Sequence, residues 1–317
     1  MTLSQLKKEF SDSLSEVYTD SESAFIFQIF AEDILGLNNF QQRQSGDLEL
    51  SDENINRFQQ IISELKTGKP YLQILGETEF YGMKIFVDEN VLIPRPETEE
   101  LLEFAIKKIQ DARCEMRDAG FGIPNSGPEI LDVNNRDFSE EKTPKTLQLS
   151  NSTIKILDIG TGSGIIPLVL KKHFPEAEIT SIDFSEKALK TAKKNADFHQ
   201  LEINFIYADY LSLDLSQNFD VIISNPPYIG IDEDNEIADS VKGFEPKMAL
   251  FSPTSDALIF YRKIAKDSKK YLHKNGLLFL EINQKLGKET LELYSNFSHS
   301  ELIKDLSGND RIIFGVK

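Results

Sequence analysis

Residues 154–164 read IKILDIGTGSG, and this stretch decides the fold class. The apolar residues Ile154–Ile159 predict a buried strand, and Gly160–Gly164 predict a tight turn into a helix that ends near His173. A glycine-rich turn lets the backbone pass close beneath a ligand, where any Cβ atom would clash. Several classes of nucleotide-binding protein use such a turn, so it predicts a ligand site without specifying the ligand.

The chain beyond this turn alternates predicted strands and helices. Strands are expected at 178–183, 203–207, 221–224 and 276–282, and helices at 185–195 and 256–272. This alternation predicts an α/β fold, a doubly wound Rossmann-like parallel sheet with helices on both faces. Residues 301–306 and 311–316 are then expected to form a closing antiparallel pair.

Residues 1–70 predict a small N-terminal helical domain. Thr2 and Gln5 have the spacing of a capping box at the start of a first helix. Ser23 is expected to precede a second helix, and Ser51 is expected to precede a third. The many apolar residues on these helices are interpreted as core packing.

Three further parts complete the predicted domain organisation. Residues 71–110 are expected to form a connecting β-hairpin and a hinge, and this range ends in a helix from about Thr98 to Gln110. Residues 111–153 are rich in glycine, proline and polar residues without a clear period, so they are interpreted as an irregular excursion. Residues 154–317 are expected to form the α/β domain.

Composition and charge narrow the function classes. Of the 317 residues, 40% are hydrophobic, and the formal net charge is −17. Binding a nucleic-acid backbone normally requires a basic surface, so nucleic acid is disfavoured as a partner and a basic protein is favoured. No apolar run approaches the roughly 18 residues of a membrane span, and the first residues, MTLSQLKKEF, lack the apolar region that is typical of a secretory signal. The single cysteine, Cys114, cannot form an internal disulfide, so a cytoplasmic protein is expected. The sequence contains no zinc-ligand cluster, so no metal site is expected, and no membrane partner is expected either.

Acidic residues follow the predicted strands. Asp183 lies 23 residues after Gly160, where a carboxylate can accept hydrogen bonds from both hydroxyls of an adenosine ribose. This spacing suits a nicotinamide nucleotide as well as S-adenosylmethionine, and the alternative role for Asp183 is a helix cap. Asp158 can hold the glycine turn or reach the cationic end of a ligand. Asp209 and Tyr210 are weaker candidates for contacts with adenine, and packing explains them equally well.

The most discriminating motif is Asn225-Pro226-Pro227-Tyr228, directly after the strand at 221–224. Two prolines fix the backbone and remove two N–H donors, which leaves carbonyl groups free to accept hydrogen bonds. The Asn225 side-chain oxygen and the Pro226 carbonyl can hold both hydrogens of a planar –NH2 group, and Tyr228 offers an aromatic face. These acceptors would also stabilise positive charge that develops on the nitrogen during methyl transfer. Asn225 and Pro226 are therefore the predicted catalytic residues.

With these motifs, the sequence resembles the peptide chain release factor glutamine methyltransferases, a family also called HemK or PrmC. The resemblance covers nearly the whole chain apart from 111–153. It is carried by PYLQILGETEFYG (70–82), LIPRPETEELL (92–102), LDIGTGSG (157–164), SNPPYI (224–229), FEPKMAL (244–250) and LEI (280–282). The combination of the Arg95–Thr98 element with Asn225–Tyr228 is more specific than either motif alone.

The resemblance implies a class I methyltransferase fold and methyl transfer from S-adenosylmethionine to a glutamine side chain of another protein. The implied acceptor is the glutamine of the Gly-Gly-Gln loop in class I release factors, which act in translation termination. The residues expected to bind it are Asn225, Pro226, Pro227 and Tyr228. The residues expected to bind the cofactor are Gly160, Thr161, Gly162, Ser163, Gly164, Asp183, Tyr210 and Asn225.

The chain departs from the family pattern in two places. Residues 111–153 intervene where the family usually has a short link, and Tyr210 stands where many members carry tryptophan. Neither change affects the residues that are expected to hold the amide.

Other functions compete with this interpretation. An adenine-N6 methyltransferase would present an exocyclic amine of nucleic acid to the same motif, although the acidic charge balance disfavours it. A nicotinamide dehydrogenase would share the glycine turn, and an inactive binding protein would keep only the fold. The joint presence of the glycine turn, Asp183 and Asn225–Tyr228 favours the methyltransferase.

Overall fold

The computed structural model describes residues 1–118, 153–228, 243–252, 254 and 256–317. The chain divides into two compact units, one of Met1–Ile93 with Glu233–Lys247 and one of Pro94–Asp232 with Met248–Lys317. This division differs from the predicted boundaries. The hairpin belongs with the N-terminal helices, and so does a segment of the region that was assigned to the α/β domain.

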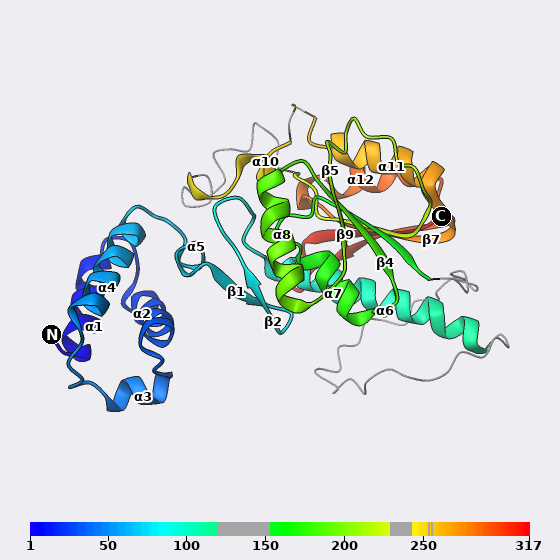
Figure 1. Cartoon of the computed structure of the whole chain (residues 1–317). Coiled ribbons are helices and arrows are strands. Elements are labelled where there is room, and N and C mark those ends of the chain that lie inside the picture. The colour runs from blue at the N-terminus through cyan, green and yellow to red at the C-terminus, as the bar shows by residue number, and fades with distance from the viewer. Residues whose placement is uncertain (119–152, 229–242, 253, 255) are drawn as a thin grey trace. The chain divides into compact units, whose positions relative to one another are not determined.

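Four helices form most of the first unit (Figure 1). They are α1 (Leu3–Leu14), α2 (Asp20–Leu35), α3 (Asn39–Gln44) and α4 (Asp52–Lys66). The rings of Phe10, Phe27 and Phe58 meet in the core of the unit, with centroids 5.2 to 6.3 Å apart. These buried aromatic side chains give the small unit its own hydrophobic core, as the sequence predicted.

Polar caps define where these helices begin. The predicted capping box at Thr2 and the predicted cap at Ser51 are both present. The predicted start of the second helix at Ser23 is wrong, because α2 begins at Asp20 with Thr19 as its cap. Thr19 and Glu22 form a complete capping box, and acidic residues in the first turn suit the positive end of the helix dipole. Ser23 is buried inside the helix.

The predicted hairpin is confirmed. A short helix, α5 (Tyr71–Leu75), precedes strands β1 (Glu77–Phe80) and β2 (Met83–Phe86), which pair antiparallel. A segment distant in sequence is fixed to this part of the first unit. Nε2 of Gln73 donates to the Phe244 carbonyl at 2.9 Å, and the Ile93 N–H donates to the Glu245 carboxylate at 3.2 Å.

The second unit is built around a seven-stranded sheet with the order β5-β4-β3-β6-β7-β9-β8. Its strands are β3 (Lys155–Ile159), β4 (Glu178–Asp183), β5 (Asn204–Tyr207), β6 (Phe219–Ser224), β7 (Leu272–Glu281), β8 (His299–Lys304) and β9 (Asp310–Val316). All neighbours pair parallel except β9, which runs antiparallel to both β7 and β8. The predicted doubly wound α/β fold with a closing antiparallel pair is therefore confirmed.

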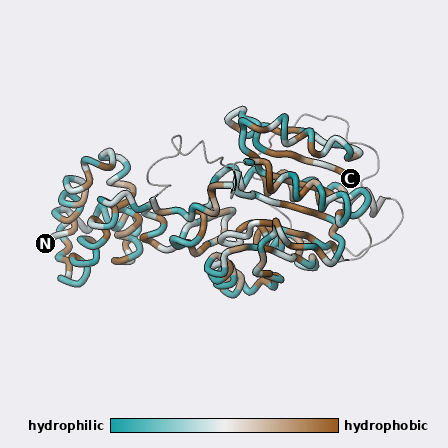
Figure 2. Tube along the Cα trace, turned by 90° about the horizontal axis from the view of Figure 1, so that it is seen from above, coloured by the Kyte–Doolittle hydropathy of each residue, from teal (hydrophilic) through white to brown (hydrophobic). Residues whose placement is uncertain are grey.

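Helices cover both faces of this sheet (Figure 1). One face carries α6 (Pro96–Asp118), α7 (Ile165–His173) and α8 (Glu186–His199), and the other carries α11 (Ile259–Tyr271) and α12 (Gly287–Glu292). Central strands are buried on both faces, so they consist of nearly continuous apolar residues. Figure 2 shows this as hydrophobic tracks along the sheet and hydrophilic residues on the outer turns of the helices.

Helix α6 is longer than the sequence predicted. It runs to Asp118, so the first residues of the predicted excursion at 111–153 are helical. Ile106, Ile109 and Ala112 continue one buried face past the predicted end at Gln110, and packing against the sheet explains the extension. The rest of the predicted excursion, 119–152, lies outside the described residues. Within the described ranges, no helix is long and apolar enough to cross a membrane.

Candidate active site

The glycine turn leaves β3 at the point where the strand order reverses between β3 and β6. In open α/β sheets, ligands bind at this position, outside the carboxyl ends of the strands. Gly160, Gly162 and Gly164 all have positive φ, at +82°, +55° and +86°. Other residues rarely adopt this backbone conformation, so the three glycines are required by the shape of the turn itself.

A buried cluster of polar side chains lies beneath the turn. The Asp158 carboxylate accepts hydrogen bonds from the Ser181 hydroxyl and, at 3.3 Å, from the Thr161 hydroxyl. The Thr161 and Ser181 hydroxyls also contact each other, so the single Thr161 proton can be given either to Asp158 or to Ser181. Among the described residues, the second carboxylate oxygen of Asp158, Oδ1, has no hydrogen-bond partner. Burial raises the pKa of Asp158 to about 7, and the negative charge of Asp183 adds to this shift.

Asp183, at the end of β4, holds the turn directly. Oδ2 of Asp183 accepts the Gly162 N–H at 2.9 Å, and Oδ1 accepts the Ser185 N–H at 2.8 Å. Burial raises the pKa of Asp183, although the hydrogen bonds from Ser185, Gly162 and Phe184 oppose the shift. Each carboxylate oxygen has two lone pairs, so these contacts leave capacity for ribose hydroxyls. The helix-cap alternative for Asp183 is wrong, because Ser185 caps α8 and its hydroxyl accepts the Ala188 N–H at 3.1 Å. The contact of Asp183 with a ribose stays a prediction.

Two further groups near the glycine turn were not predicted from the sequence. Phe184 follows Asp183 and exposes 55% of its surface at the carboxyl edge of the sheet, where a flat apolar face could cover a purine. The second group is on α8: Asn195 donates to the Ser163 carbonyl at 2.8 Å. The only available sequence signal for Phe184 is a large aromatic residue directly after the acid.

The remaining predicted cofactor residues occupy different environments. Thr161 and Ser163 have buried side chains that support the turn. Asp209 is exposed and accepts the Leu211 N–H at 3.0 Å. Tyr210 is only 4% exposed and belongs to the core of the second unit; the ammonium of Lys263 lies 4.9 Å from the centre of its ring. The packing alternative thus describes the position of Tyr210, and its cofactor contact stays a prediction.

The Asn225-Pro226-Pro227-Tyr228 motif lies next to the glycine turn. A Cβ atom added to Gly160 would lie 3.6 Å from the Asn225 carbonyl oxygen and 4.0 Å from Cα of Pro226. The Ser224 hydroxyl donates to the Ile159 carbonyl at 2.7 Å and joins the ends of β6 and β3. The structure therefore brings the two motifs together, because β3 and β6 are neighbouring parallel strands.

Asn225 belongs to a second buried polar cluster. Its amide nitrogen, Nδ2, donates to the Thr98 hydroxyl at 3.2 Å, and the Thr98 hydroxyl donates to the Glu281 carboxylate at 2.8 Å. Asn225 also hydrogen-bonds to Glu281. Thr98 and Glu281 are 2% and 1% exposed. Sequence reasoning gave neither residue a role in the site, because they lie 127 and 56 positions from Asn225.

Tyr228 completes the motif. It is partly buried and packs against the core of the second unit, and its carbonyl accepts from Nδ2 of Asn283 at 3.4 Å. Burial raises the pKa of the Tyr228 hydroxyl, and the charge of Glu281 raises it further. Tyr228 therefore stays neutral, which suits contact with a neutral, flat group better than proton abstraction.

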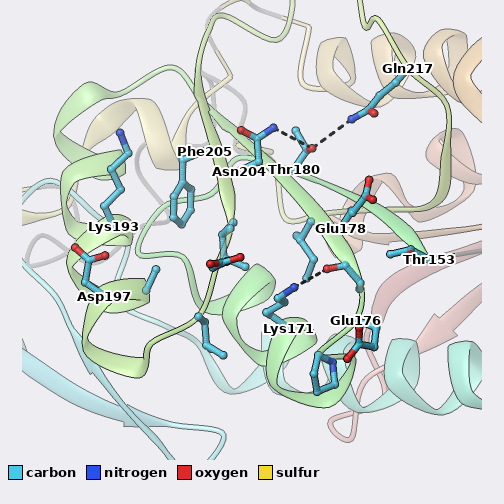
Figure 3. A pocket seen from close by; sticks show the side chains of 17 residues that line it. Thr153, Lys171, Glu176, Glu178, Thr180, Lys193, Asp197, Asn204, Phe205 and Gln217 are labelled. Atoms are coloured by element: carbon cyan, nitrogen blue, oxygen red, sulfur yellow. Dashed lines mark hydrogen bonds between the residues drawn. The ribbon is translucent and has the colours of Figure 1, made fainter.

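A pocket at the opposite edge of the sheet contains none of the predicted site residues (Figure 3). It lies at the amino ends of β4 and β5. Asn204 and Gln217 both donate to the Thr180 hydroxyl, at 3.3 and 3.4 Å, and Lys171 donates to the Ala177 carbonyl at 2.7 Å. The pocket is not the candidate active site, because ligands of open α/β sheets bind outside the carboxyl ends of the strands.

The residues at the carboxyl edge fit S-adenosylmethionine. An added Cβ on Gly162 would meet no described atom within 4 Å, so there is open space for a ligand at this part of the turn. Oδ1 of Asp158, which has no partner among the described residues, suits a cationic group, and Asp183 suits a ribose. Phe184 suits an adenine ring.

Comparisons with known proteins agree with this geometry. The Methyltransferase small domain family matches residues 143–241, and the PrmC N-terminal domain family matches residues 5–76. The release factor glutamine methyltransferase of Flavobacterium psychrophilum is 39% identical over 317 residues, which cover 99% of this chain and 98% of that protein. The proteins of the same name from Bacteroides thetaiotaomicron and Streptococcus pneumoniae are each 32% identical. Their alignments cover 95% and 99% of this chain, and 95% and 98% of those proteins.

The fold, the glycine turn and the matched domain define this protein as an α/β methyltransferase. More particularly, the chain belongs to the release factor glutamine methyltransferase family.

Proposed function

We propose that this enzyme transfers a methyl group from S-adenosylmethionine to the side-chain amide nitrogen of the glutamine in the Gly-Gly-Gln loop of class I release factors. The names of its relatives support a release factor as substrate. The observation that carries the proposal is the approach of Gly160 to the Asn225 carbonyl oxygen and Pro226. A ligand over the turn and a group held by Asn225 would then be immediate neighbours.

Residues of the turn and of β4 would hold the methyl donor. When bound, S-adenosylmethionine supplies a methyl group that is attached to a cationic sulfur. After transfer of the methyl group, the sulfur is a neutral thioether. Asp183 would accept from the ribose hydroxyls, and Asp158 would stabilise the positive charge from below the turn. Phe184 would exclude water from the adenine face.

Asn225 and Pro226 would hold the acceptor. An amide nitrogen is a poor nucleophile because its lone pair is delocalised into the carbonyl. Oδ1 of Asn225 and the Pro226 carbonyl would accept the two amide hydrogens and fix the nitrogen within about 3–3.5 Å of the methyl carbon. As positive charge moves to the nitrogen, these oxygens stabilise it, and one proton then leaves to water. Tyr228 would pack on the flat amide group.

The first unit would bind the body of the release factor. Residues 1–93 contain 16 acidic and seven basic side chains, so this unit suits a basic protein surface. Phe25 and Phe40 are exposed on it, and exposed aromatic side chains are frequent anchors of protein interfaces.

A transfer assay with a labelled methyl group tests the proposal. Purified class I release factor should become labelled, and a release factor with alanine in place of the loop glutamine should not. DNA and RNA serve as the other arm of the same assay. Label on adenine without label on the release factor would establish the adenine-N6 alternative and overturn the proposal.

A further inference from the structure

The Asn225 side chain can adopt two orientations that exchange its oxygen and nitrogen, and its neighbours permit only one of them. Glu281 is an acceptor when it is ionised. The single Thr98 hydroxyl proton is given to Glu281 Oε2 at 2.8 Å, so Thr98 presents only lone pairs to Asn225. The reversed orientation would place Oδ1 of Asn225 against these lone pairs and the carboxylate. Nδ2 must therefore point toward Thr98 and Glu281.

We propose that Thr98 and Glu281 are positioning residues that hold the Asn225 side chain with Nδ2 inward, so that Oδ1 remains the acceptor for the substrate amide. This inference rests on the proposed function for the role of Oδ1. The reversed orientation would present N–H donors to the –NH2 group of the substrate, and the two groups would repel each other. The correct orientation is therefore a condition of substrate positioning.

Opposing effects set the ionisation of Glu281: burial is the largest and raises its pKa, so the carboxylate is ionised mainly above about pH 7. Arg311 on β9 lowers the pKa of Glu281, and Asp305 holds Arg311 through an Nε–Oδ2 contact of 3.1 Å. Burial and the charge of Glu97 act in the opposite direction and leave the pKa at about 7. The Tyr261 hydroxyl on α11 donates to the Glu281 backbone carbonyl at 2.9 Å and so fixes the end of β7. Thr98 and Glu281, from two segments distant in sequence, thus together hold the Asn225 side chain.

Two variants remove the hydrogen bonds that hold Asn225 with little change in side-chain volume. Thr98→Val removes the hydroxyl, and Glu281→Gln allows the neighbouring groups to reverse. Each should lower kcat for release factor methylation roughly 10- to 100-fold, with KM and the affinity for S-adenosylhomocysteine within about threefold of the wild type. Thr98→Ser keeps the hydroxyl, so its kcat should stay near the wild-type value. Thr290→Val is the matched control, because the Thr290 hydroxyl is also buried and bonded, at 2.7 Å to the Leu286 carbonyl.

A double-mutant cycle separates positioning from general damage to the fold. If Thr98 acts through Asn225, Thr98→Val should cost nothing further in kcat when Asn225 is already alanine. Additive losses, a Thr98→Ser enzyme as slow as Thr98→Val, or a Thr98→Val enzyme with wild-type kcat would each overturn the inference.

A measurement without substrate keeps this inference separate from the proposed function. In protein labelled with nitrogen-15 asparagine, the Asn225 side-chain signal can be assigned by its absence in Asn225→Ala. Its N–H protons should exchange with solvent more slowly in the wild type than in Thr98→Val. Equal exchange rates would contradict the inference. A wild-type enzyme that fails to methylate any release factor would instead contradict the proposed function.

Discussion

The Asp183 carboxylate accepts the backbone N–H of Gly162 at 2.9 Å. One residue at the end of β4 therefore sets the shape of the turn that follows β3, in addition to any contact with a ligand. Its replacement should affect both the turn and the cofactor.

Asp183→Ala is expected to weaken binding of S-adenosylmethionine roughly 10- to 100-fold. Hydrogen bonds to a charged group contribute about 1.5–3 kcal/mol, and both the ribose and the Gly162 N–H lose theirs. Isothermal titration calorimetry measures the affinity. Glu176→Ala is the control, since it removes the same charge from an exposed position at the opposite edge of the sheet. Unchanged affinity in Asp183→Ala would contradict a ligand role and leave this residue with support of the glycine turn alone.

Gly162 and Gly164 are expected to respond differently to alanine. At Gly164, φ is +86° and the new Cβ would lie 3.1 Å from Cβ of Ala192, so Gly164→Ala should destabilise the fold by roughly 2–4 kcal/mol. At Gly162 the new Cβ meets no described atom, so Gly162→Ala should cost about 1–2 kcal/mol from its positive φ.

Thermal unfolding and cofactor titration distinguish these two effects. Gly162→Ala should lose far more affinity than its small loss of stability explains, because its Cβ enters the space proposed for the ligand. If Gly162→Ala binds S-adenosylmethionine as tightly as the wild type, the ligand does not lie over this part of the turn.

Cofactor affinity should rise with pH between about pH 6 and pH 8. The pKa of Asp158 is raised to about 7, so this carboxyl group is mainly neutral at the lower pH. A cationic ligand favours the ionised form, and binding must therefore displace a proton when the pH is below the pKa. The expected gain is up to about tenfold. Asp158→Asn should remove this part of the pH dependence, and a wild-type profile no steeper than that of Asp158→Asn would contradict the assignment.

An exposed aromatic residue tests the role of the first unit. Phe40 in α3 is 67% exposed, and Phe40→Ser should raise KM for intact release factor roughly 5- to 30-fold if it anchors the partner. Activity on a short Gly-Gly-Gln peptide should not change, because the peptide is too short to reach a second surface. Phe198→Ser, at an exposed position on α8 of the other unit, is the matched control. Equal KM values for Phe40→Ser and the wild type would remove Phe40 from the interface.

The sequence predicted the features that depend on local patterns. Alternating strands and helices, the capping boxes and the glycine turn all follow from residues that are close in the chain. The adjacency of Gly160 and Asn225 was not predicted, because it depends on the pairing of β3 with β6, which local patterns do not specify. The end of α6 was predicted too early, since tertiary packing of Ile109 and Ala112 extends the helix beyond its local signals.

Contacts between segments distant in sequence were not predictable. Thr98 and Glu281 are 183 residues apart, and their hydrogen bond depends on how α6 packs against the end of β7. The burial of Tyr210 also depends on α11, which supplies Lys263 next to its ring. A single sequence carries no periodic signal for such pairs.

Tandem mass spectrometry of a release factor after incubation with the enzyme and S-adenosylmethionine tests the central claim most directly. The Gly-Gly-Gln peptide should carry one added methyl group, with fragment ions that locate it on the glutamine side-chain amide. Asn225→Ala should reduce the rate of this modification roughly 10²- to 10³-fold while cofactor binding stays largely intact, because the lost acceptor acts mostly in the transition state. A methyl group on another residue, or an unmodified glutamine after full incubation with active wild-type enzyme, would contradict the proposed function.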